Sequence, residues 1–531
     1  MKKNNIPLNF REKINSRISL LCSAVVLVLL VLVIFQIDHT LISRPQKEAA
    51  QLEEQQTEEE TNTPEISTAS VIAVGDNLFF QSLYQSGQYD SGIWNYDHIY
   101  THIQSQVQAA DVAMIDQETV FTTDHDAVSS SPSFATPTEV GDAIVKAGFN
   151  VVESATEHID DYGYDYLKQT LDFWSSTYPD VPVLGIHSTQ EDADTVKVKE
   201  VNGIKIAFLD YTYGTNNSGA GEGNEYMIDI FDKYRITTMI QKARQVSDCI
   251  IFVAHWGTAD ETMPTEYEKQ WTTFLMQQGV NVIIGGHPHV LQPYGQLSDD
   301  QGNSTTVFYS LGNFVSTQET LSELLEGMAS FTIQKTTLNG ETSIQILSPE
   351  VKPMVMHYNY ESGEYGPYML DDYTDELAAS HSIRDVLGDE FTVANLQAKF
   401  KEIMSMNVTP STDSNLLNVK FDADGTMTDK TTGDYVEDTA SVSASDYLAA
   451  SGNSSDSSGS SDNSDAGSGD NSDGNDTYDS NYDSSYYDDS YDNSYDSSYD
   501  DSSYYDEDYD SSYDSSYDDS YYDDNSYDDS Y

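Results

Sequence analysis

The sequence predicts an α/β domain, and the patterns that predict it are clearest near the middle of the chain. Residues 250–253 and 280–284 are short apolar runs rich in β-branched side chains, which is typical of strands covered on both faces. Between them, apolar residues from Tyr267 to Leu275 recur at helical spacing, and Gly279 closes the segment. A strand–helix–strand unit of this kind indicates a parallel sheet.

The same patterns continue on both sides of this unit. They predict strands at 70–74, 112–115, 150–153, 181–186, 205–209 and 306–310, and helices at 99–107, 138–147, 164–174, 232–246 and 392–404. A hairpin is expected at 328–347, around Asn339-Gly340. This alternation predicts one mixed α/β domain at 68–357, followed at 358–440 by a mainly helical extension that packs on it.

The N-terminal region predicts a membrane anchor. Residues 1–17 are basic, and 18–37 form an apolar stretch long enough to span a bilayer. The basic flank places the N-terminus in the cytoplasm, so an acidic stalk at 38–67 and everything after it would lie outside the cell membrane. A cleaved signal peptide is the competing interpretation. A lipoprotein signal at Cys22 is disfavoured by the bulky leucine before it.

The chain is strongly acidic, with a formal charge of −66. Residues 451–531 hold 25 acidic residues and no Lys or Arg, and subtracting these leaves −41 on the rest. Such a charge repels phosphate backbones, so no nucleic-acid partner is expected. The Ser-, Asp- and Tyr-rich segment 441–531 is expected to be disordered. It would serve as a solvated spacer or, alternatively, bind divalent cations weakly or mediate adhesion.

Three histidines follow the two central strands. His255 ends the first, and His287 and His289 flank a proline just after the second. The carboxyl ends of neighbouring parallel strands meet at one edge of a sheet, and imidazole is a common ligand for transition metals. This placement predicts a metal site. The alternative is a proline-stiffened loop that carries two solvated histidines.

Acidic and polar residues follow the other predicted strands. They are Asp76, Asp116, Glu118, Glu157 and His158, with Asn313 nearby. Carboxylates and imidazoles together suit a hydrolytic site with one or two divalent ions. Each residue also has a structural alternative: an aspartate after a strand can cap a helix, and His158 alone would more often be structural. The joint placement at successive strand ends favours the metal site.

These residues lie in six short strings, namely Gly75-Asp76, Asp116-Gln-Glu118, 155–163, His255-Trp-Gly257, Gly-Gly-His-Pro-His-Val-Leu-Gln at 285–292 and Tyr-Ser-Leu-Gly-Asn-Phe-Val at 309–315. In this order the strings resemble the CapA family of capsule synthesis proteins, which is associated with poly-γ-glutamate. The resemblance covers about residues 67–356 and places the chain in a branch of the calcineurin-like metallophosphoesterases.

The resemblance implies a four-layer α/β/β/α sandwich of metallo-dependent phosphatase type, with one or two divalent ions (Mn, Zn, Fe or Mg). The ligands it implies are Asp76, Asp116, Glu118, Glu157, His255, His287 and His289. His158 would be the catalytic general acid, and Asn313 would contact substrate. Asp116 and Glu157 stand where the family has asparagine, and Ala259 stands where it often has glutamate. His187 is additional to the pattern and is expected to be structural or incidental.

Two functions follow as hypotheses. The first is a single-pass, extracytoplasmic, metal-dependent hydrolase in capsule or surface-polymer biosynthesis or export, with the polymer or its synthesis and export proteins as partners. An amide, an ester or a phosphodiester substrate is compatible with the site. The second, favoured by Glu157 and Ala259, is a non-catalytic binding or assembly component of the export machinery.

Overall fold

The computed structural model describes residues 8–43, 63–89, 91–217, 219–412, 419–421 and 427–429. The expected stalk at 38–67 is therefore described only at its two ends. Most of the segment at 413–440 and the whole acidic tail at 441–531 lie outside the described residues.

A long apolar helix, α1 (Leu8–Ile37), stands at the start of the described chain, and the π-helical turn Asp38–Ser43 follows it. The stretch Asn15–Thr40, which begins inside α1 and ends in this turn, has a mean hydropathy of 3.2 and is long enough to cross a membrane. A signal sequence close to the N-terminus meets the same criterion. The helix covers the expected apolar span 18–37 in full.

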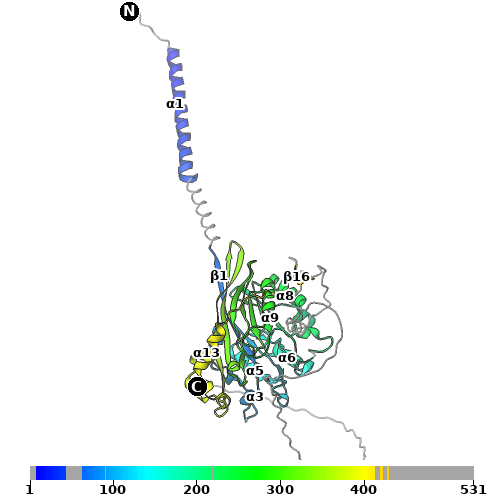
Figure 1. Ribbon diagram of the computed structural model, residues 1–531. Helices are drawn as coiled ribbons and strands as arrows, with labels where there is room; N and C mark the ends of the chain where they lie inside the picture. The colour runs from blue at the N-terminus through cyan, green and yellow to red at the C-terminus, as the bar shows by residue number, and fades with distance from the viewer. Residues whose placement is uncertain are drawn as a thin grey trace, which may run out of the picture. The chain divides into compact units, whose positions relative to one another are not determined.

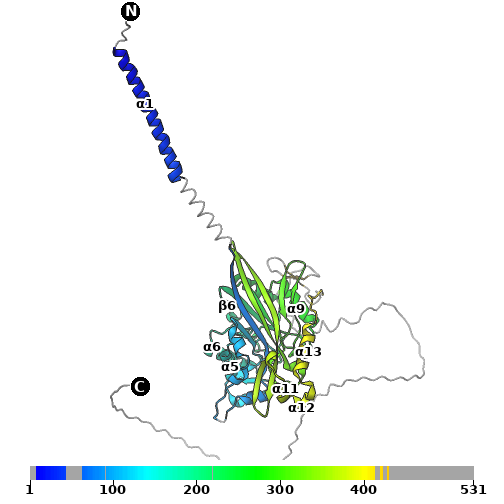
Figure 2. The same ribbon diagram turned by 90° about the vertical axis from the view of Figure 1, so that its left-hand side faces the viewer.

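The first sheet has seven strands. In spatial order these are β15 (Glu364–Met369), β14 (Glu341–Asn359), β13 (Leu325–Leu338), β1 (Glu65–Asn77), β2 (Val112–Asp116) and β5 (Val151–Glu153), with β12 (Asn313–Val315) also paired to β1. β1, β2 and β5 run parallel, whereas β13, β14 and β15 form antiparallel pairs. The long strands β13 and β14 lie beside β1 in Figure 2. The predicted hairpin around Asn339-Gly340 is thereby confirmed.

The second sheet has six strands. Their order is β10 (Tyr294–Ser298), β11 (Ser304–Phe308), β9 (Val282–Gly286), β8 (Cys249–His255), β7 (Ile204–Thr212) and β6 (Lys197–Val201). β7, β8, β9 and β11 are parallel, and antiparallel strands flank them on both edges. The predicted unit of strand, helix and strand is present as β8, α9 (Glu266–Gln277) and β9. A parallel pair, β3 (Val120–Thr122) and β4 (Ala135–Pro137), and a small hairpin, β16 (Val419–Phe421) and β17 (Met427–Asp429), complete the strands described.

The two sheets pack against each other, and helices cover their outer faces. Alternate residues of β7 divide between two cores: Ile206 and Phe208 join a core that also contains residues of β1 and β2, whereas Ala207 and Leu209 join a core with α9 and α8 (Lys233–Val246). Figure 1 shows α8 and α9 on one side of the sheets and α13 (Val393–Met404) on the other. The fold is therefore the expected four-layer α/β/β/α sandwich.

The remaining helices are short or flank the sheets. They are α3 (Gln81–Ser86), α4 (Gln104–Ala109), α5 (Glu139–Ala147), α6 (Gly163–Thr177), α7 (Gln190–Ala193), α10 (Leu321–Leu324), α11 (Asp375–Ser380) and α12 (Arg384–Leu387). The predicted helix at 99–107 is divided between a 3₁₀ turn, Asp97–Tyr100, and α4.

The predicted strand at 181–186 is wrong. This segment makes only isolated bridges, from Val183 to Val152 and from Ile186 to Ile228. Pro182 has no backbone N–H to donate to a ladder, and Gly185 has a positive φ of 73°. The apolar composition reflects burial of the segment rather than strand pairing.

The C-terminal extension begins inside the first sheet, because β14 runs to Asn359 and β15 follows it, so the expected boundary at 357 falls within a strand. His357 and His381 are buried there, with ring centroids 5.0 Å apart. His381 Nε2 donates to the Met356 carbonyl (3.0 Å), and its Nδ1 accepts from the Ile383 N–H (2.9 Å). Both ring nitrogens are therefore satisfied in the neutral form.

We expect acid to destabilise this extension. Burial lowers the pKa of His357 to about 4 and that of His381 to about 3. The unfolded chain therefore takes up these protons first, so stability is complete above about pH 6.5 and falls as the pH drops towards the folded values, by about 1–2 kcal/mol for each histidine at pH 5. Urea unfolding at pH 7 and pH 5 measures the loss. The double variant His357→Gln/His381→Gln should lose less stability over this interval, whereas exposed His125→Gln should behave like wild type. An equal loss in the double variant would contradict the expectation.

Candidate metal centre

The parallel strands of the first sheet bring three of the expected site residues to one edge. Asp76 stands near the carboxyl end of β1, in register with Asp116 at the end of β2 and with Asn313 at the start of β12. All three side chains are buried. Close backbone packing makes this possible, because a Cβ at Gly75 would lie 1.8 Å from the Gly312 carbonyl oxygen.

The second sheet supplies the histidines. His255 is the last residue of β8 and is paired with Gly286, the last residue of β9. His287 and His289 follow with positive φ angles of 92° and 59°, a conformation that costs energy for residues other than glycine. A strained backbone conformation of this kind persists where the surrounding structure enforces it. In this conformation the His287 ring lies beside Glu157, and the His289 ring lies beside Asp76.

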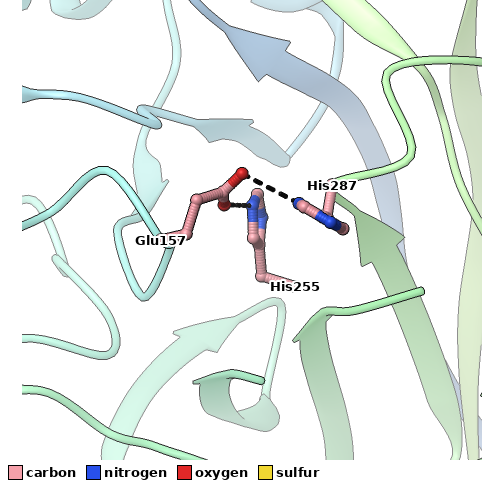
Figure 3. A group of neighbouring side chains, drawn as sticks. All are labelled: Glu157, His255 and His287. Carbon is pink, nitrogen blue, oxygen red and sulfur yellow. Dashed lines mark hydrogen bonds and ion pairs between the residues drawn. The ribbon is translucent and has the colours of Figure 1, made fainter. Parts of the chain in front are cut away.

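One group of possible ligands consists of Glu157, His255 and His287. The Glu157 carboxylate lies between the two rings (Figure 3), with Oε1 2.9 Å from His287 Nδ1 and Oε2 in contact with His255 Nε2. All three residues are buried. Glu157 thus lies in the cluster in spite of being a glutamate where the family pattern has asparagine.

A second group consists of Asp76, Glu118 and His289. His289 Nδ1 lies 3.1 Å from Asp76 Oδ2, and its Nε2 lies 4.0 Å from Glu118 Oε1. Asp116 connects this group to the first, because its Oδ2 is 3.1 Å from His255 Nδ1 and it forms a further group with Asp76 and His255. All seven expected ligands therefore meet in one buried cluster.

The charges of the cluster depend strongly on one another. Burial raises the pKa of Glu118 well above its usual range, and raises that of Asp116 to about 6. Burial alone would favour neutral His255, but Glu157 and Asp116 raise the pKa of its imidazole well above normal. Glu157 is buried too, yet His287 and His255 hold its pKa well below the ordinary value. In the protein alone, protonated imidazoles thus supply the positive charge that the carboxylates need.

The chemistry of these residues fits one or two divalent ions. Both oxygens of Glu118 and Oδ1 of Asp116 are buried without a hydrogen-bond partner in the part of the chain that the structure describes. A buried carboxylate in that condition is costly unless a cation compensates it. The backbone also leaves room, since a Cβ at Gly286 would lie 2.8 Å from Asp76 Oδ1 and 3.1 Å from Asp116 Oδ2. Mixed oxygen and imidazole ligands are those used for hydrolytic metals.

His158 stands at the border of the cluster and forms a further group with Glu118 and Glu157. Its Nδ1 is 2.7 Å from Asp161 Oδ2, which also accepts the Phe134 N–H (2.7 Å). The Asn216 side-chain amide lies 3.1 Å from the same nitrogen. Asp161 therefore orients the ring and leaves Nε2 available, an arrangement suited to a proton donor or acceptor.

The sequence patterns missed three residues around the site. Asp161 could have been found by its spacing of three from His158 in an ordered turn. Tyr213, whose ring centroid is 4.6 Å from that of His287, and Asn216, whose N–H donates to the Glu157 carbonyl (2.9 Å), follow directly on β7. The predicted strand at 205–209 ended too early, because β7 continues through Thr212. Polar residues just beyond its true end were therefore overlooked.

Asn313 and His187 each have side-chain partners that indicate what they do. Asn313 is fully buried, with Oδ1 3.2 Å from His289 Nδ1 and its amide bonded to Gln318 Oε1 (2.6 Å) and to the Glu323 carbonyl. These contacts favour orientation of His289, and contact with substrate stays a prediction. His187 belongs to none of the ligand groups, and its Nε2 is 2.7 Å from Asp229 Oδ2.

A second row of acids lies behind the cluster. Glu153 is in register with Asp116, and Asp210 on β7 accepts the N–H groups of Ser154 and Ala155 at 2.9 and 3.0 Å. Burial raises the pKa of Asp210 to about 8. The Asp210 carboxyl thus fixes the start of the loop that carries Glu157.

The two packed sheets form a four-layer α/β/β/α sandwich, and a buried cluster of carboxylates and imidazoles lies at the carboxyl ends of their parallel strands. Residues 70–318 match the family model for the bacterial capsule synthesis protein PGA_cap. This part of the chain, a little under half of its length, is therefore similar to that family, as the sequence motifs predicted.

Two curated relatives come from bacilli. The PGA biosynthesis protein CapA of Bacillus subtilis (strain 168) is 31% identical over 167 residues, which are 32% of this chain and 42% of the relative. The capsule biosynthesis protein CapA of Bacillus anthracis is 27% identical over 177 residues, which are 33% of this chain and 41% of the relative. The aligned region thus spans less than half the length of these relatives.

Solved structures show a more distant likeness. A novel phosphatase from Mycoplasma pneumoniae matches with a TM-score of 0.30 and 12% identity, covering 54% of this chain and 95% of that one. The sulfate thiohydrolase SoxB of Thermus thermophilus matches with a TM-score of 0.28 and 11% identity, covering 47% and 42%. At these scores the likeness says nothing of substrate or mechanism.

Proposed function

We propose that the protein is a membrane-anchored, extracytoplasmic hydrolase of capsule or surface-polymer biosynthesis, with a divalent metal centre. The observation that carries the proposal is the buried cluster in which four carboxylates and three imidazoles form overlapping groups of three, each with its ligand atoms within 4.8 Å of one another. The role in capsule biosynthesis is supported by the family of residues 70–318 and by both curated relatives. The apolar helix α1 supports the anchor.

The residues divide into ligands and proton carriers. Glu157, His255 and His287 would hold one ion, and Asp76, Glu118 and His289 a second, with Asp116 between them. Ions bound there would supply Lewis acidity and activate a water near neutral pH. His158, held by Asp161, would give a proton to the departing atom of the substrate. Asn313 would keep the His289 ring in place.

Anchoring would set where the site works. The basic residues before α1 favour a cytoplasmic N-terminus, which places the sandwich and its metal centre outside the membrane. The substrate would then be a polymer, or a precursor of it, that has already crossed the membrane. The strong negative net charge of the chain repels phosphate backbones, so a nucleic acid is an unsuitable partner.

The test is made in cells that produce the surface polymer. We expect full-length Asp76→Ala and His287→Ala variants, each expressed at the wild-type level, to lose most of the polymer or to change its chain length, because each removes a ligand of the centre. Polymer is measured in the cell-bound and released fractions. Exposed Glu319→Gln serves as the control and should behave like wild type.

A non-catalytic assembly component is the second candidate, and Glu157 in an asparagine position is the feature that favours it. If both variants keep wild-type polymer amount and length while remaining folded and membrane-bound, the hydrolase proposal is wrong. Loss of polymer together with loss of membrane fractionation would show instead that the substitutions disrupt the protein as a whole.

A further inference from the structure

The charge of the metal centre limits the substrates it can accept. We propose that the centre acts on a neutral acyl group, namely an amide or ester carbonyl, and not on a phosphate monoester. This inference rests on the proposed function, because it narrows the substrate of the same site. It concerns the group that reacts, and other charged parts of a polymer can remain outside the cluster.

The carboxylates of the cluster carry a large formal negative charge. Asp76, Asp116, Glu118 and Glu157 are at most 5% exposed and contribute four negative charges when they bind metal. The ion pairs of these acids with the three histidines all lie within the cluster. Among the described residues, no Lys or Arg forms an ion pair with any member of the cluster.

Two divalent ions would just balance the charge of these carboxylates. Two divalent cations carry four positive charges, so they neutralise the four carboxylates and leave nothing over. A single ion would leave the centre negative by two charges. The acids of the second row, Glu153 and Asp210, are buried behind the cluster and add no positive charge. The centre is thus neutral at best.

Possible substrates differ in the charge that they bring into the site. A phosphate monoester is a dianion, and burying it requires compensation, which phosphoryl-transfer sites supply through Arg, Lys or metal clamps with net positive charge. A neutral centre without a basic side chain does not supply it. An amide or ester carbonyl enters without charge and develops only one negative charge as water attacks. A neutral centre with locally concentrated cations can stabilise that single charge.

The proton donor suits the same chemistry. In amide hydrolysis the C–N bond breaks, the oxygen of the water stays on the acyl carbon, and the departing nitrogen must receive a proton. His158 is partly accessible, with a side chain 13% exposed, and it borders the cluster beside Glu118 and Glu157. The Tyr213 ring packs against His287, with ring centroids 4.6 Å apart. The residues that border the cluster therefore include an acid–base side chain and an aromatic ring, neither of which supplies a fixed positive charge.

Binding of inorganic phosphate tests this inference without a turnover assay. The full-length protein in detergent is loaded with Mn²⁺, its metal content is verified, and phosphate is titrated in a calorimeter. We expect the Kd for phosphate to be weaker than about 1 mM. Glu157→Gln removes one negative charge from the cluster and should tighten phosphate binding by at least about tenfold. The same change at exposed Glu319 should have no effect.

Each possible result of the titrations either supports or overturns the inference. A Kd tighter than about 1 mM for the wild-type metal-loaded protein would overturn the inference and leave the hydrolase proposal standing. An unchanged phosphate affinity in Glu157→Gln would overturn it too, provided that this variant keeps its metal. If Glu157→Gln loses its metal, Asp116→Asn makes the same charge change and replaces it. A wild-type protein that takes up no metal would overturn the proposed function and this inference together.

Discussion

Replacing Gly286 by alanine is expected to weaken metal binding by about 10- to 100-fold, although no ligand is changed. The added Cβ would lie 2.8 Å from Asp76 Oδ1, 3.1 Å from Asp116 Oδ2 and 3.3 Å from His255 Nδ1. A contact of 2.8 Å is closer than non-bonded atoms approach and the other two are tighter than usual, so the Asp76 carboxylate must move and its two neighbours must shift slightly. Because β8 and β9 pair at His255 and Gly286, the backbone has little freedom to give way.

Calorimetric titration of the metal-free variant with Mn²⁺ measures the effect, and circular dichroism shows whether the fold is kept. Gly214→Ala is the matched control, because a Cβ there has no neighbour within 4 Å and its φ is not in the left-handed region. Wild-type affinity in a folded Gly286→Ala protein would show that the metal is not bound at the ends of these strands.

Removing the metal is expected to lower the Tm of the protein by about 5–15 °C. An ion present at 100 to 1,000 times its Kd stabilises the folded state by about 3–4 kcal/mol, and each kcal/mol shifts the Tm of a domain of this size by about 2–4 °C. Here the ion would also compensate buried carboxylates such as Glu118, whose two oxygens have no hydrogen-bond partner among the described residues.

Differential scanning calorimetry of the full-length protein with saturating Mn²⁺, and again after chelation with EDTA, measures the shift. The His287→Ala/His289→Ala variant should melt at one temperature under both conditions, because it has no site to fill. An unchanged wild-type Tm after complete removal of metal would contradict the expectation and show that the acids are compensated within the protein.

The fold was accessible from sequence where the pattern was long and regular. The unit from Cys249 to Gly286 was predicted with its parallel pairing, because buried strands and an amphipathic helix leave clear periodicities. The segment 181–186 misled because its apolar residues pack into the core without pairing as a strand, and a short apolar run does not distinguish these two cases. Strand ends were also underestimated, as with β7.

The candidate metal ligands could be predicted from the sequence, whereas most of the residues that hold them in place could not. Asp76, His255 and His287 were predicted because they stand at strand ends, and parallel strands bring their carboxyl ends together. Tyr213 contacts His287, which lies far along the chain, and no sequence pattern marks that contact. Asp161 lies only three residues from His158, and that spacing could have indicated their contact. The positive φ angles of His287 and His289 likewise depend on how the two sheets meet.

The central claim is that the buried cluster binds divalent metal, and elemental analysis of the purified full-length protein tests it most directly. The wild-type protein, isolated without added chelator, should contain one or two ions of Mn, Zn, Fe or Mg per chain. The His287→Ala/His289→Ala variant should have lost them, whereas Glu319→Gln should retain the wild-type content. A folded wild-type protein without metal, or one with the same metal content as the double variant, would contradict the assignment of the cluster as a metal centre.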